Sequence, residues 1–341
     1  MSARFGLLEI PRSVRAVLEH VQLAEEMGFD WIGVADSQSL YREVFATLGM
    51  IAHATKKPLI GPTVTNGLTR HPAVMASAIA TVNEISGGRA ILGIGTGDSA
   101  VFNINERPRG LKGLREYVLT LKELLRGAET EFNGRGIHTR WIETQENNPV
   151  PIYIAAEGPK TLELAGEIAD GVICGMGLTP DVVETTLKHI DAGAKRAGKT
   201  ADDLDIWAFA KVNVGPDRDE LIREVRMELA STAHHAFQFT LEGKLVPPEL
   251  RDALNRIQKE YQPTLHLTLG ETSNAKLMED PVLMPYLVDR FAVLGTADEC
   301  VAQVERIKSS GIDQILFTGN IEKRSTLIRK LGTDVLPRCR D

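Results

Sequence analysis

The sequence predicts an α/β fold of the TIM-like (β/α)8 barrel type. Short apolar runs of strand length alternate with segments of helical periodicity along the 341 residues, and no low-complexity linker divides them. Eight such strands alternating with helices specify either a closed barrel or an open doubly wound sheet. Helices follow the strands throughout the chain, which favours the barrel.

The amino-terminal half shows this alternation in its simplest form. Phe5–Ile10 and Trp31–Ala35 are apolar runs of strand length, as expected for strands that are covered on both faces. Between them, Ser13 can cap a helix whose apolar residues recur at helical spacing until Gly28 ends it. The same rhythm continues with a helix at 42–55, a strand at 57–65, a helix at 72–85 and a strand at 90–95.

The carboxyl-terminal half supplies the other four strands. Two of its helices open on a proline, Pro159 and Pro180, which is typical of the first helical position. Strands are expected at 151–156, 171–174, 206–214 and 314–318, and helices at 114–125, 158–168, 180–197, 221–230, 248–258, 297–309 and 323–331.

Three segments interrupt the alternation and predict insertions. They lie at about 99–113 after strand four, 127–149 after helix four, and 232–293 between strands seven and eight. The second contains FNGRG, whose Asn-Gly dipeptide suits a hairpin turn. The third is too long for a plain loop, so we expect an accessory helical element or lid. The whole chain, 1–341, is expected to form one domain.

Composition restricts the class of partner. The formal charge of -7 and the pI near 5.7 argue against nucleic-acid and anionic-membrane partners, because either would require a concentrated basic face. The chain has no signal peptide and no apolar run long enough to span a bilayer, so a cytoplasmic location is expected. The three cysteines are far apart and predict neither a disulfide framework nor a zinc site.

The stretch Gly61–Asp98 reads as strand, helix and strand, with polar or glycine-rich residues where each strand ends. Thr63–Asn66 closes the first of these strands and Thr96–Asp98 closes the second. In parallel α/β folds the carboxyl ends of the strands meet at one edge, where ligands bind. We therefore expect the chemistry at this edge.

The motif GIGTGD, Gly93–Asp98, is not a dinucleotide fingerprint, because Asp98 stands where the third glycine would be and no helix opens there. It also lacks the Lys-Ser/Thr pair of a phosphate-binding P-loop. Two interpretations remain open. The glycines either let a flat ring approach the backbone or simply form a tight turn.

Two helix openings are candidates for anion binding, Gly158 with Pro159 and Gly175–Gly177 before Pro180. Flexible backbone followed by proline can aim free N–H groups at a phosphate. The alternative is an ordinary capped helix start, in which Asp181 satisfies part of the positive helix end.

Asp36 and Glu9 close neighbouring predicted strands, so a barrel brings both carboxylates to one mouth. They could polarise a cofactor ring or relay protons there, or could be a helix cap and a rim charge. His234 and His235 have no acidic or cysteine ligands at metal spacing nearby, so no metal site is expected. The absence of GxSxG, HExxH and CxxC argues against hydrolases and metalloenzymes.

Three blocks carry a family resemblance: GPTVTNGLTRHPAVMASAIATVNEISGGRAILGIGTGD, PIYIAAEGPKTLELAGEIADGVICGMG and FAVLGTADECVAQVERIKSSGIDQILF. Together they resemble the bacterial luciferase-like monooxygenase superfamily, and most closely its methylenetetrahydromethanopterin reductase-like branch. The resemblance implies a TIM-like barrel that binds reduced FMN or the deazaflavin F420 across its mouth. It also implies a bulge or non-proline cis peptide around Thr63 and Val64, and a homodimer.

The resemblance further implies site residues. Segments 99–113 and 232–290 would cover the substrate. Histidine directly follows the strand-two acid in F420-dependent dehydrogenases of the family, whereas Ser37 follows Asp36 here, which argues against secondary-alcohol or sugar-phosphate dehydrogenation. The implied ring contacts are Asp36, Thr63, Val64, Asn66 and Thr96, and the implied phosphate contacts are Gly158, Gly175, Met176 and Gly177.

Three functions follow as hypotheses. The first is an FMNH2-dependent monooxygenase of a small organic substrate, supplied by a separate flavin reductase, with Asp36 as the catalytic residue. The second is an F420-dependent reductase that transfers hydride to an unsaturated substrate. The third is a non-catalytic flavin-binding protein.

Overall fold

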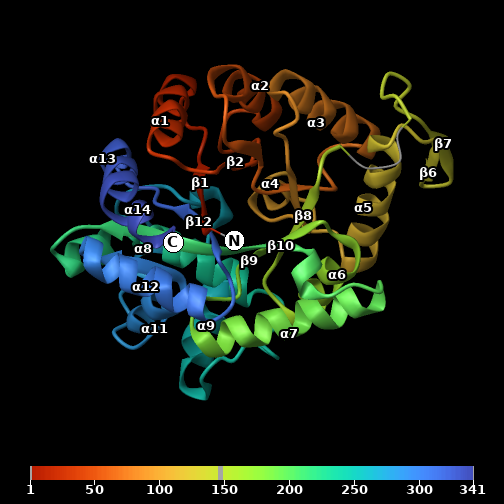
Figure 1. Ribbon diagram of the computed structural model, residues 1–341. Helices are drawn as coiled ribbons and strands as arrows, with labels where there is room; N and C mark the ends of the chain where they lie inside the picture. The colour runs from red at the N-terminus through yellow and green to blue at the C-terminus, as the bar shows by residue number, and fades with distance from the viewer. Residues whose placement is uncertain (1, 145–148, 341) are drawn as a thin grey trace.

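Parallel strands form the centre of the molecule and helices surround them (Figure 1). The computed structural model describes residues 2–144 and 149–340. The strands lie side by side in the order β3-β2-β1-β12-β10-β9-β8-β5-β4. Their bounds are Arg4–Glu9 (β1), Trp31–Val34 (β2), Leu59–Pro62 (β3), Thr65–Asn66 (β4), Leu92–Gly95 (β5), Ile152–Ala156 (β8), Gly171–Cys174 (β9), Asp205–Val214 (β10) and Gln314–Thr318 (β12).

The sheet closes on itself because β3 and β4 share one strand position. β3 pairs with β2, and β4 pairs with β5 on the other side. Ile60 of β3 also pairs with Ala90, just before β5. A cis peptide bond joins Thr63 and Val64 between the two segments. The predicted eight-position barrel is confirmed, as is the non-proline cis peptide at the end of its third strand.

Helix α3 (Pro72–Ser86) begins and ends at capping residues that the sequence provides. For α3, the Nδ1 atom of His71 accepts a hydrogen bond from the Ala73 amide, Pro72 takes the first helical position, and Gly87 ends the helix at a φ of 69°. The helices around the barrel are Val14–Glu26 (α1), Val44–Ala54 (α2), Pro72–Ser86 (α3), Leu111–Leu125 (α5), Pro159–Ile168 (α6), Pro180–Arg196 (α7), Arg218–Phe237 (α8), Ala297–Ser309 (α12), Arg324–Lys330 (α13) and Leu336–Cys339 (α14).

A layer of large side chains fills the barrel interior. Trp31 and Trp207 are fully buried with their rings 4.9 Å apart, and Ile91, Tyr153, Ile173 and Leu316 complete the layer. Val64, Ala155 and Phe209 pack against this layer from the carboxyl side. This layer therefore fills the interior of the barrel, and a ligand can enter at the carboxyl ends of the strands.

The first two insertions are short. The one after β5 contains a single helical turn, α4 (Ser99–Phe102), where the sequence predicted only a loop. The second contains the predicted hairpin, β6 (Thr130–Phe132) and β7 (Arg135–Ile137), which turns at Asn133 and Gly134, both of which have positive φ. Residues 145–148, within the predicted insertion at 127–149, lie outside the described residues.

The third insertion folds over the barrel mouth. Helix α8 runs to Phe237, farther than the predicted end at 230, because its last turns are buried under the insertion instead of facing solvent. The insertion also adds a strand, β11 (Ala292–Gly295), which the sequence did not predict and which pairs with Lys211–Val214 of β10. Its helices are α9 (Arg251–Glu260), α10 (Ser273–Lys276) and α11 (Leu283–Phe291).

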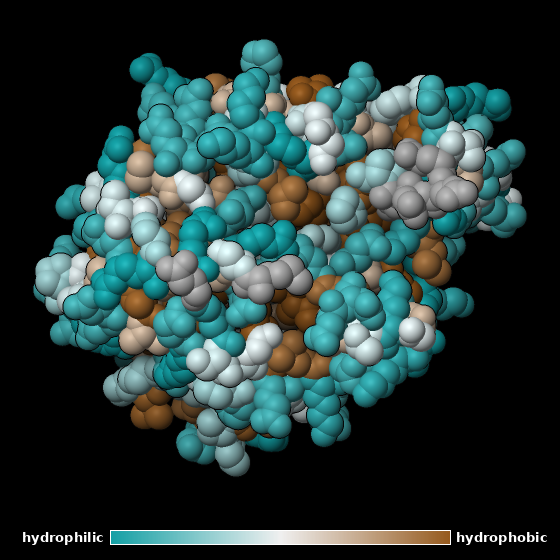
Figure 2. Space-filling model, viewed as in Figure 1, coloured by the Kyte–Doolittle hydropathy of each residue, from teal (hydrophilic) through white to brown (hydrophobic). Residues whose placement is uncertain are grey.

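The surface is mixed in character. The rim of the face shown in Figure 2 is mostly hydrophilic, and hydrophobic residues gather toward its middle. Within the described residues, none of the helices has the length and apolarity that crossing a membrane would require.

Candidate active site

Two adjoining cavities occupy the carboxyl mouth of the barrel. The first, here called the ring cavity, has a volume of about 200 Å³ and lies between the cis peptide of β3 and the end of β10. The second, the side cavity, has a volume of about 650 Å³ and lies over the start of α6. The two share the wall residues Thr96, Ala155, Glu157, His235 and Gln238. A ligand can therefore extend from one cavity into the other.

Most of the predicted site residues come together here. Asp36, Thr63, Val64, Asn66, Thr96 and Gly175 line the ring cavity. Gly158 lines the side cavity, where Pro159 begins α6. The strands that deliver these residues are distant in sequence but neighbours in the sheet, as the barrel prediction required. Their contacts with a cofactor remain a prediction.

Met176 and Gly177 do not line either cavity in the described structure. The backbone turns inward after Gly175, and the carbonyl oxygen of Met176 accepts a hydrogen bond from Nε of Arg290 at 2.9 Å. Arg290 also donates to backbone carbonyls of the third insertion at Lys244 and Leu245. These two residues thus anchor the insertion to the barrel, which a reading of the helix opening alone could not reveal.

Asp36 lines the ring cavity, but its carboxylate already has partners. Arg70 donates to both oxygens, at 2.5 and 3.2 Å, and the Thr65 hydroxyl donates at 2.6 Å. Arg70 thus neutralises Asp36, and it also donates a hydrogen bond to Glu43. Glu9 points away from the cavity and pairs with Arg324 and His20. The wall at β1 and β2 is therefore electrically balanced.

The glycines of GIGTGD divide into two kinds. A Cβ at Gly93 would lie 2.4 Å from the Pro62 carbonyl oxygen, so this glycine allows two strands to approach closely. Gly95 and Gly97 line the ring cavity instead. A Cβ at Gly95 would meet only Val64 and Ala155 side chains, at 3.3 and 3.9 Å. Gly93 thus fits neither interpretation of the motif, because it lies within β5, and the approach of a flat ring to Gly95 and Gly97 stays a prediction.

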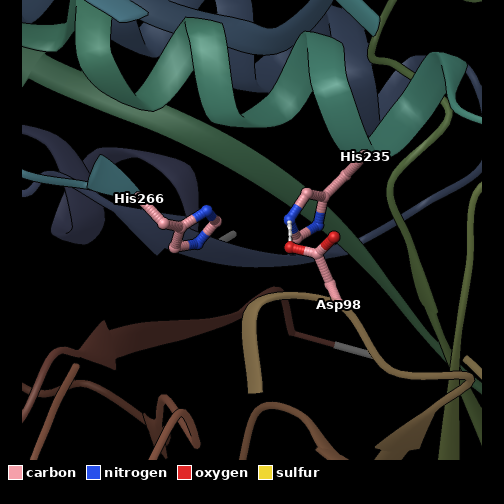
Figure 3. Close-up of side chains that lie close together, drawn as sticks. All are labelled: Asp98, His235 and His266. Carbon is pink, nitrogen blue, oxygen red and sulfur yellow. Dashed lines mark ion pairs between the residues drawn. The ribbon is translucent and has the colours of Figure 1, made fainter. Parts of the chain in front are cut away.

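A cluster of ionisable side chains forms around Asp98 (Figure 3). Asp98 stands on the loop after β5, His235 reaches it from α8, and His266 approaches from the third insertion. Nε2 of His235 lies 2.6 Å from one Asp98 oxygen, within ion-pair contact but not aligned as a hydrogen bond, and Nε2 of His234 lies 3.5 Å from the other. The His266 ring stacks on His235 with centroids 5.3 Å apart.

The two stacked histidines differ in charge. Burial by itself would lower the pKa of His235, but the Asp98 carboxylate raises it to about 9. Burial also opposes the charge on Asp98, yet His235 and His234 hold its pKa well below the ordinary range. For His266, burial and the neighbouring His235 cation lower the pKa to about 3. At neutral pH the cluster is thus an Asp98 carboxylate, a His235 imidazolium and a neutral His266.

Asp98, His235 and His266 could also hold a metal ion by distance, because one ligand atom of each lies within 4.8 Å of the others. A metal ligand must offer a free lone pair. Because Asp98 raises the pKa of His235 to about 9, His235 would have to release a proton to bind a metal at neutral pH.

Other charges line the mouth. Burial raises the pKa of Glu157, a residue common to both cavities. Lys211 of β10 and Glu228 of α8 line the ring cavity and are 5% and 1% exposed. Burial lowers the pKa of Lys211 to about 8, although the nearby carboxylates of Glu228 and Glu157 oppose this shift.

Sequence reasoning missed the roles of these charged residues. Lys211 left a signal, as the one charged residue inside the otherwise apolar stretch IWAFAKVNV. Glu157 directly follows β8 and Asp98 closely follows β5, so both could have been recognised in the same way as Asp36. His235, His266 and Glu228 left none, because their meeting depends on how the third insertion covers the mouth.

Comparison with known proteins gives consistent matches over nearly the whole chain. The family model described as luciferase-like monooxygenase matches residues 3–314. A 5,10-methylenetetrahydromethanopterin reductase from Archaeoglobus fulgidus is 32% identical, over 99% of this chain and 100% of that protein. An F420-dependent glucose-6-phosphate dehydrogenase from Nakamurella multipartita is 33% identical, over 93% and 90%.

Among solved structures, the coenzyme F420 dependent tetrahydromethanopterin reductase from Methanopyrus kandleri superposes with a TM-score of 0.77. It is 25% identical and covers 99% of both chains. Family model, relatives and fold agree over the barrel and its insertions. The chain therefore belongs to the luciferase-like monooxygenase family of oxidoreductases.

Proposed function

We propose that the protein is an F420-dependent reductase, which transfers a hydride to a small substrate bound at the barrel mouth. The single observation that carries this proposal is the Asp98–His235 pair, a protonated acid in the wall of a ring-sized cavity. Addition of a hydride to carbon leaves a negative charge on a neighbouring atom, and that atom needs a proton. The pair supplies one.

The choice of cofactor follows the relatives. The Nakamurella relative and the Methanopyrus structure are F420-dependent by name, and none of the three names mentions FMN. Monooxygenases among the similar structures share 13–19% of their residues with this chain, which supports the fold alone. F420 is therefore preferred over the FMNH2-dependent monooxygenase and its flavin reductase partner.

The ring cavity fits a deazaflavin ring. The cis peptide at Thr63–Val64 presents flat backbone, Gly95 adds no side chain, and Ile173 and Ala155 supply apolar wall. The hydroxyl oxygen of Thr63 is buried without a hydrogen-bond partner, so a polar ring edge could satisfy it. In the side cavity, Gly158 at the α6 opening and Lys160 suit the charged side chain of the cofactor. When bound, F420H2 supplies the hydride.

The residues of this chain then orient the reactants and move a proton. The third insertion, through His266 and Leu267, covers the ring cavity and excludes water. His235 holds the transferable proton on its imidazolium, and Asp98 keeps it charged. Asp36 is less suited to this task, because Arg70 and Thr65 occupy its oxygens. We assign the acid role to His235 with Asp98.

For a methylene bridge between two nitrogens, as in the relatives' substrate, the balance is simple. The hydride forms a C–H bond, one C–N bond breaks, and the electron pair stays on that nitrogen. His235 protonates the nitrogen as the bond breaks. Ser37, which follows Asp36 in place of the dehydrogenases' histidine, is buried and lies 3.0 Å from the Ser99 hydroxyl. That arrangement offers no base for oxidising an alcohol, which favours reduction.

Titration of the purified protein with F420 and with FMN, followed by visible spectra, tests the cofactor. We expect tight F420 binding and weak FMN binding. Tight FMN binding with no response to F420 would support the monooxygenase instead. Failure of F420H2 to be oxidised with any of a panel of methylene-bridged and unsaturated substrates would favour a non-catalytic flavin-binding protein.

We also propose that the protein is a homodimer. A shallow apolar groove runs between α2 and α3, with Val74 57% and Ile85 49% exposed beside Phe45 and Ala78. Such a patch on a surface helix pair suits a second copy of the chain. Sedimentation equilibrium should give twice the 37.4 kDa chain mass, and a monomer at high concentration would exclude the dimer.

A further inference from the structure

Two buried charges line the ring cavity, and neither is fully hydrogen-bonded by the described residues. The ammonium of Lys211 makes no hydrogen bond or ion pair with any described residue, although it lies 4.0 Å above the Phe209 ring. One oxygen of Glu228 accepts hydrogen bonds from the Thr318 hydroxyl and the Asn320 amide, while the other is buried without any. Buried unpaired polar groups are costly, so a native protein that keeps two in one cavity wall is prepared for a ligand.

Their position in the barrel separates them from the cofactor wall. Counted along the sheet order β3-β2-β1-β12-β10, the strand that carries Lys211 is four positions from the strand that carries the cis peptide. In an eight-position barrel, four positions is directly across. Lys211 and Phe209, two residues apart on β10, both face the cavity, and Glu228 faces it from α8. A ring on the cis-peptide wall therefore leaves this second wall to the substrate.

The orientation of Glu228 is fixed. Because Thr318 and Asn320 hold one oxygen, the carboxylate cannot rotate freely, and its second oxygen is left without a hydrogen-bond partner in a residue that lines the cavity. Lys211 is a strong donor that makes no hydrogen bond with a described residue, although the carboxylates of Glu228 and Glu157 lie near enough to act on its pKa. The wall thus presents one acceptor and one donor beside an aromatic face, Phe209. This pattern complements a flat heterocycle with an N–H or amino donor beside a carbonyl oxygen.

We propose that Glu228 and Lys211 recognise the amino-pyrimidinone edge of a pterin-type substrate, with the free Glu228 oxygen accepting from the amino group and ring N–H and Lys211 donating to the carbonyl oxygen. The pterin ring lies beside Phe209, and its reacting carbon faces the cofactor wall. This assignment rests on the proposed function, whose substrate it names by class.

Binding of two simple heterocycles tests the assignment. Pterin carries an amino group beside its ring N–H, and lumazine has a carbonyl oxygen in place of that amino group. Isothermal titration of the full-length protein, with and without saturating F420, should show pterin bound about tenfold or more tighter than lumazine, as expected for one charge-assisted hydrogen bond. Glu228→Gln should invert or abolish this preference, because the new amide can donate to the lumazine carbonyl.

Controls separate recognition from folding. Glu220→Gln changes an exposed carboxylate on the same helix and should leave both affinities unchanged. Lys211→Met should weaken both heterocycles by a similar factor, since both have the carbonyl oxygen that it binds. F420 affinity serves as the check that each variant is folded.

The possible results distinguish a wrong assignment of Glu228 and Lys211 from a wrong cofactor. Equal affinity of the wild type for pterin and lumazine would overturn this assignment even if F420 binds. So would a failure of both heterocycles to bind, whether or not the protein is saturated with F420. An unchanged preference in Glu228→Gln would also overturn it. If F420 fails to bind but the pterin preference and its inversion are found, the proposed cofactor fails and the recognition wall stands.

Discussion

The two walls of the ring cavity differ in how completely their charged side chains are paired. On the β2–β4 side, Asp36 is neutralised by Arg70, and the surface consists of flat backbone and small side chains. On the side formed by β10, α8 and the third insertion, one Glu228 oxygen has no hydrogen-bond partner, Lys211 lies against the Phe209 ring, and His235 is charged. A balanced wall supports a ring by shape, whereas unbalanced groups are available for recognition and proton transfer.

This contrast predicts its largest effect at Asp98. Asp98→Asn removes the carboxylate that keeps His235 protonated, so turnover with F420H2 should fall by about 100-fold or more at neutral pH. F420 affinity should change little, because the ring rests on the other wall. Steady-state kinetics with parallel F420 titrations measures both. If turnover is retained, the acid lies elsewhere, and Asp36→Asn would be the variant to examine next.

Breaking the balance of the first wall should cost stability and not chemistry. Arg70→Met leaves the Asp36 carboxylate, whose side chain is 1% exposed, without its cation, and the free energy of unfolding should fall by about 3 kcal/mol. Urea denaturation measures the change. The double variant Asp36→Asn with Arg70→Met should recover much of the loss, since no unpaired charge remains. An additive loss in the double variant would show that the two residues do not act as a pair.

The pH profile reports on the second wall. The folded-state pKa of His235 is raised from 6.5 to about 9, so its proton is present at neutral pH and lost as pH rises through about 9. We expect kcat/KM to be flat near neutrality and to fall on the alkaline side of that pKa. The stability that this raised pKa contributes is fully present below the unfolded pKa of 6.5 and should be lost as pH rises from there through about 9. In Asp98→Asn the alkaline limb should move to lower pH, and a profile that does not move would separate the limb from His235.

The smallest expected effect concerns the fit of the ring. Gly95→Ala places a methyl group in the cavity wall with only side chains nearby, so F420 affinity should weaken by several-fold, about tenfold at most, with little change in Tm. Gly93→Ala is the matched comparison. Its methyl group would meet the Pro62 carbonyl, and it should lower Tm markedly. Equal F420 affinity in Gly95→Ala and wild type would mean that the ring does not approach this strand end.

The first wall could be predicted from the sequence almost residue by residue. Asp36, Thr63, Asn66 and Thr96 each follow a short apolar run, and the carboxyl ends of parallel strands necessarily meet at one edge. The same local logic did not foresee the contact of Met176, whose carbonyl accepts a hydrogen bond from Arg290, a residue more than a hundred positions away. A strand end predicts where the backbone arrives and not which way the following loop turns.

The sequence by itself determined the barrel, its carboxyl mouth and the strand-end residues of the first wall, because these depend on local periodicity and on the geometry of parallel strands. Only the tertiary structure decided where the charges of the active site lie. Asp98 meets His235 and His266 because the third insertion folds back over the mouth, and Glu228 faces Lys211's cavity because α8 crosses it. Such contacts between segments far apart in the chain leave no spacing or period in the sequence, since they are fixed by the packing of the whole fold.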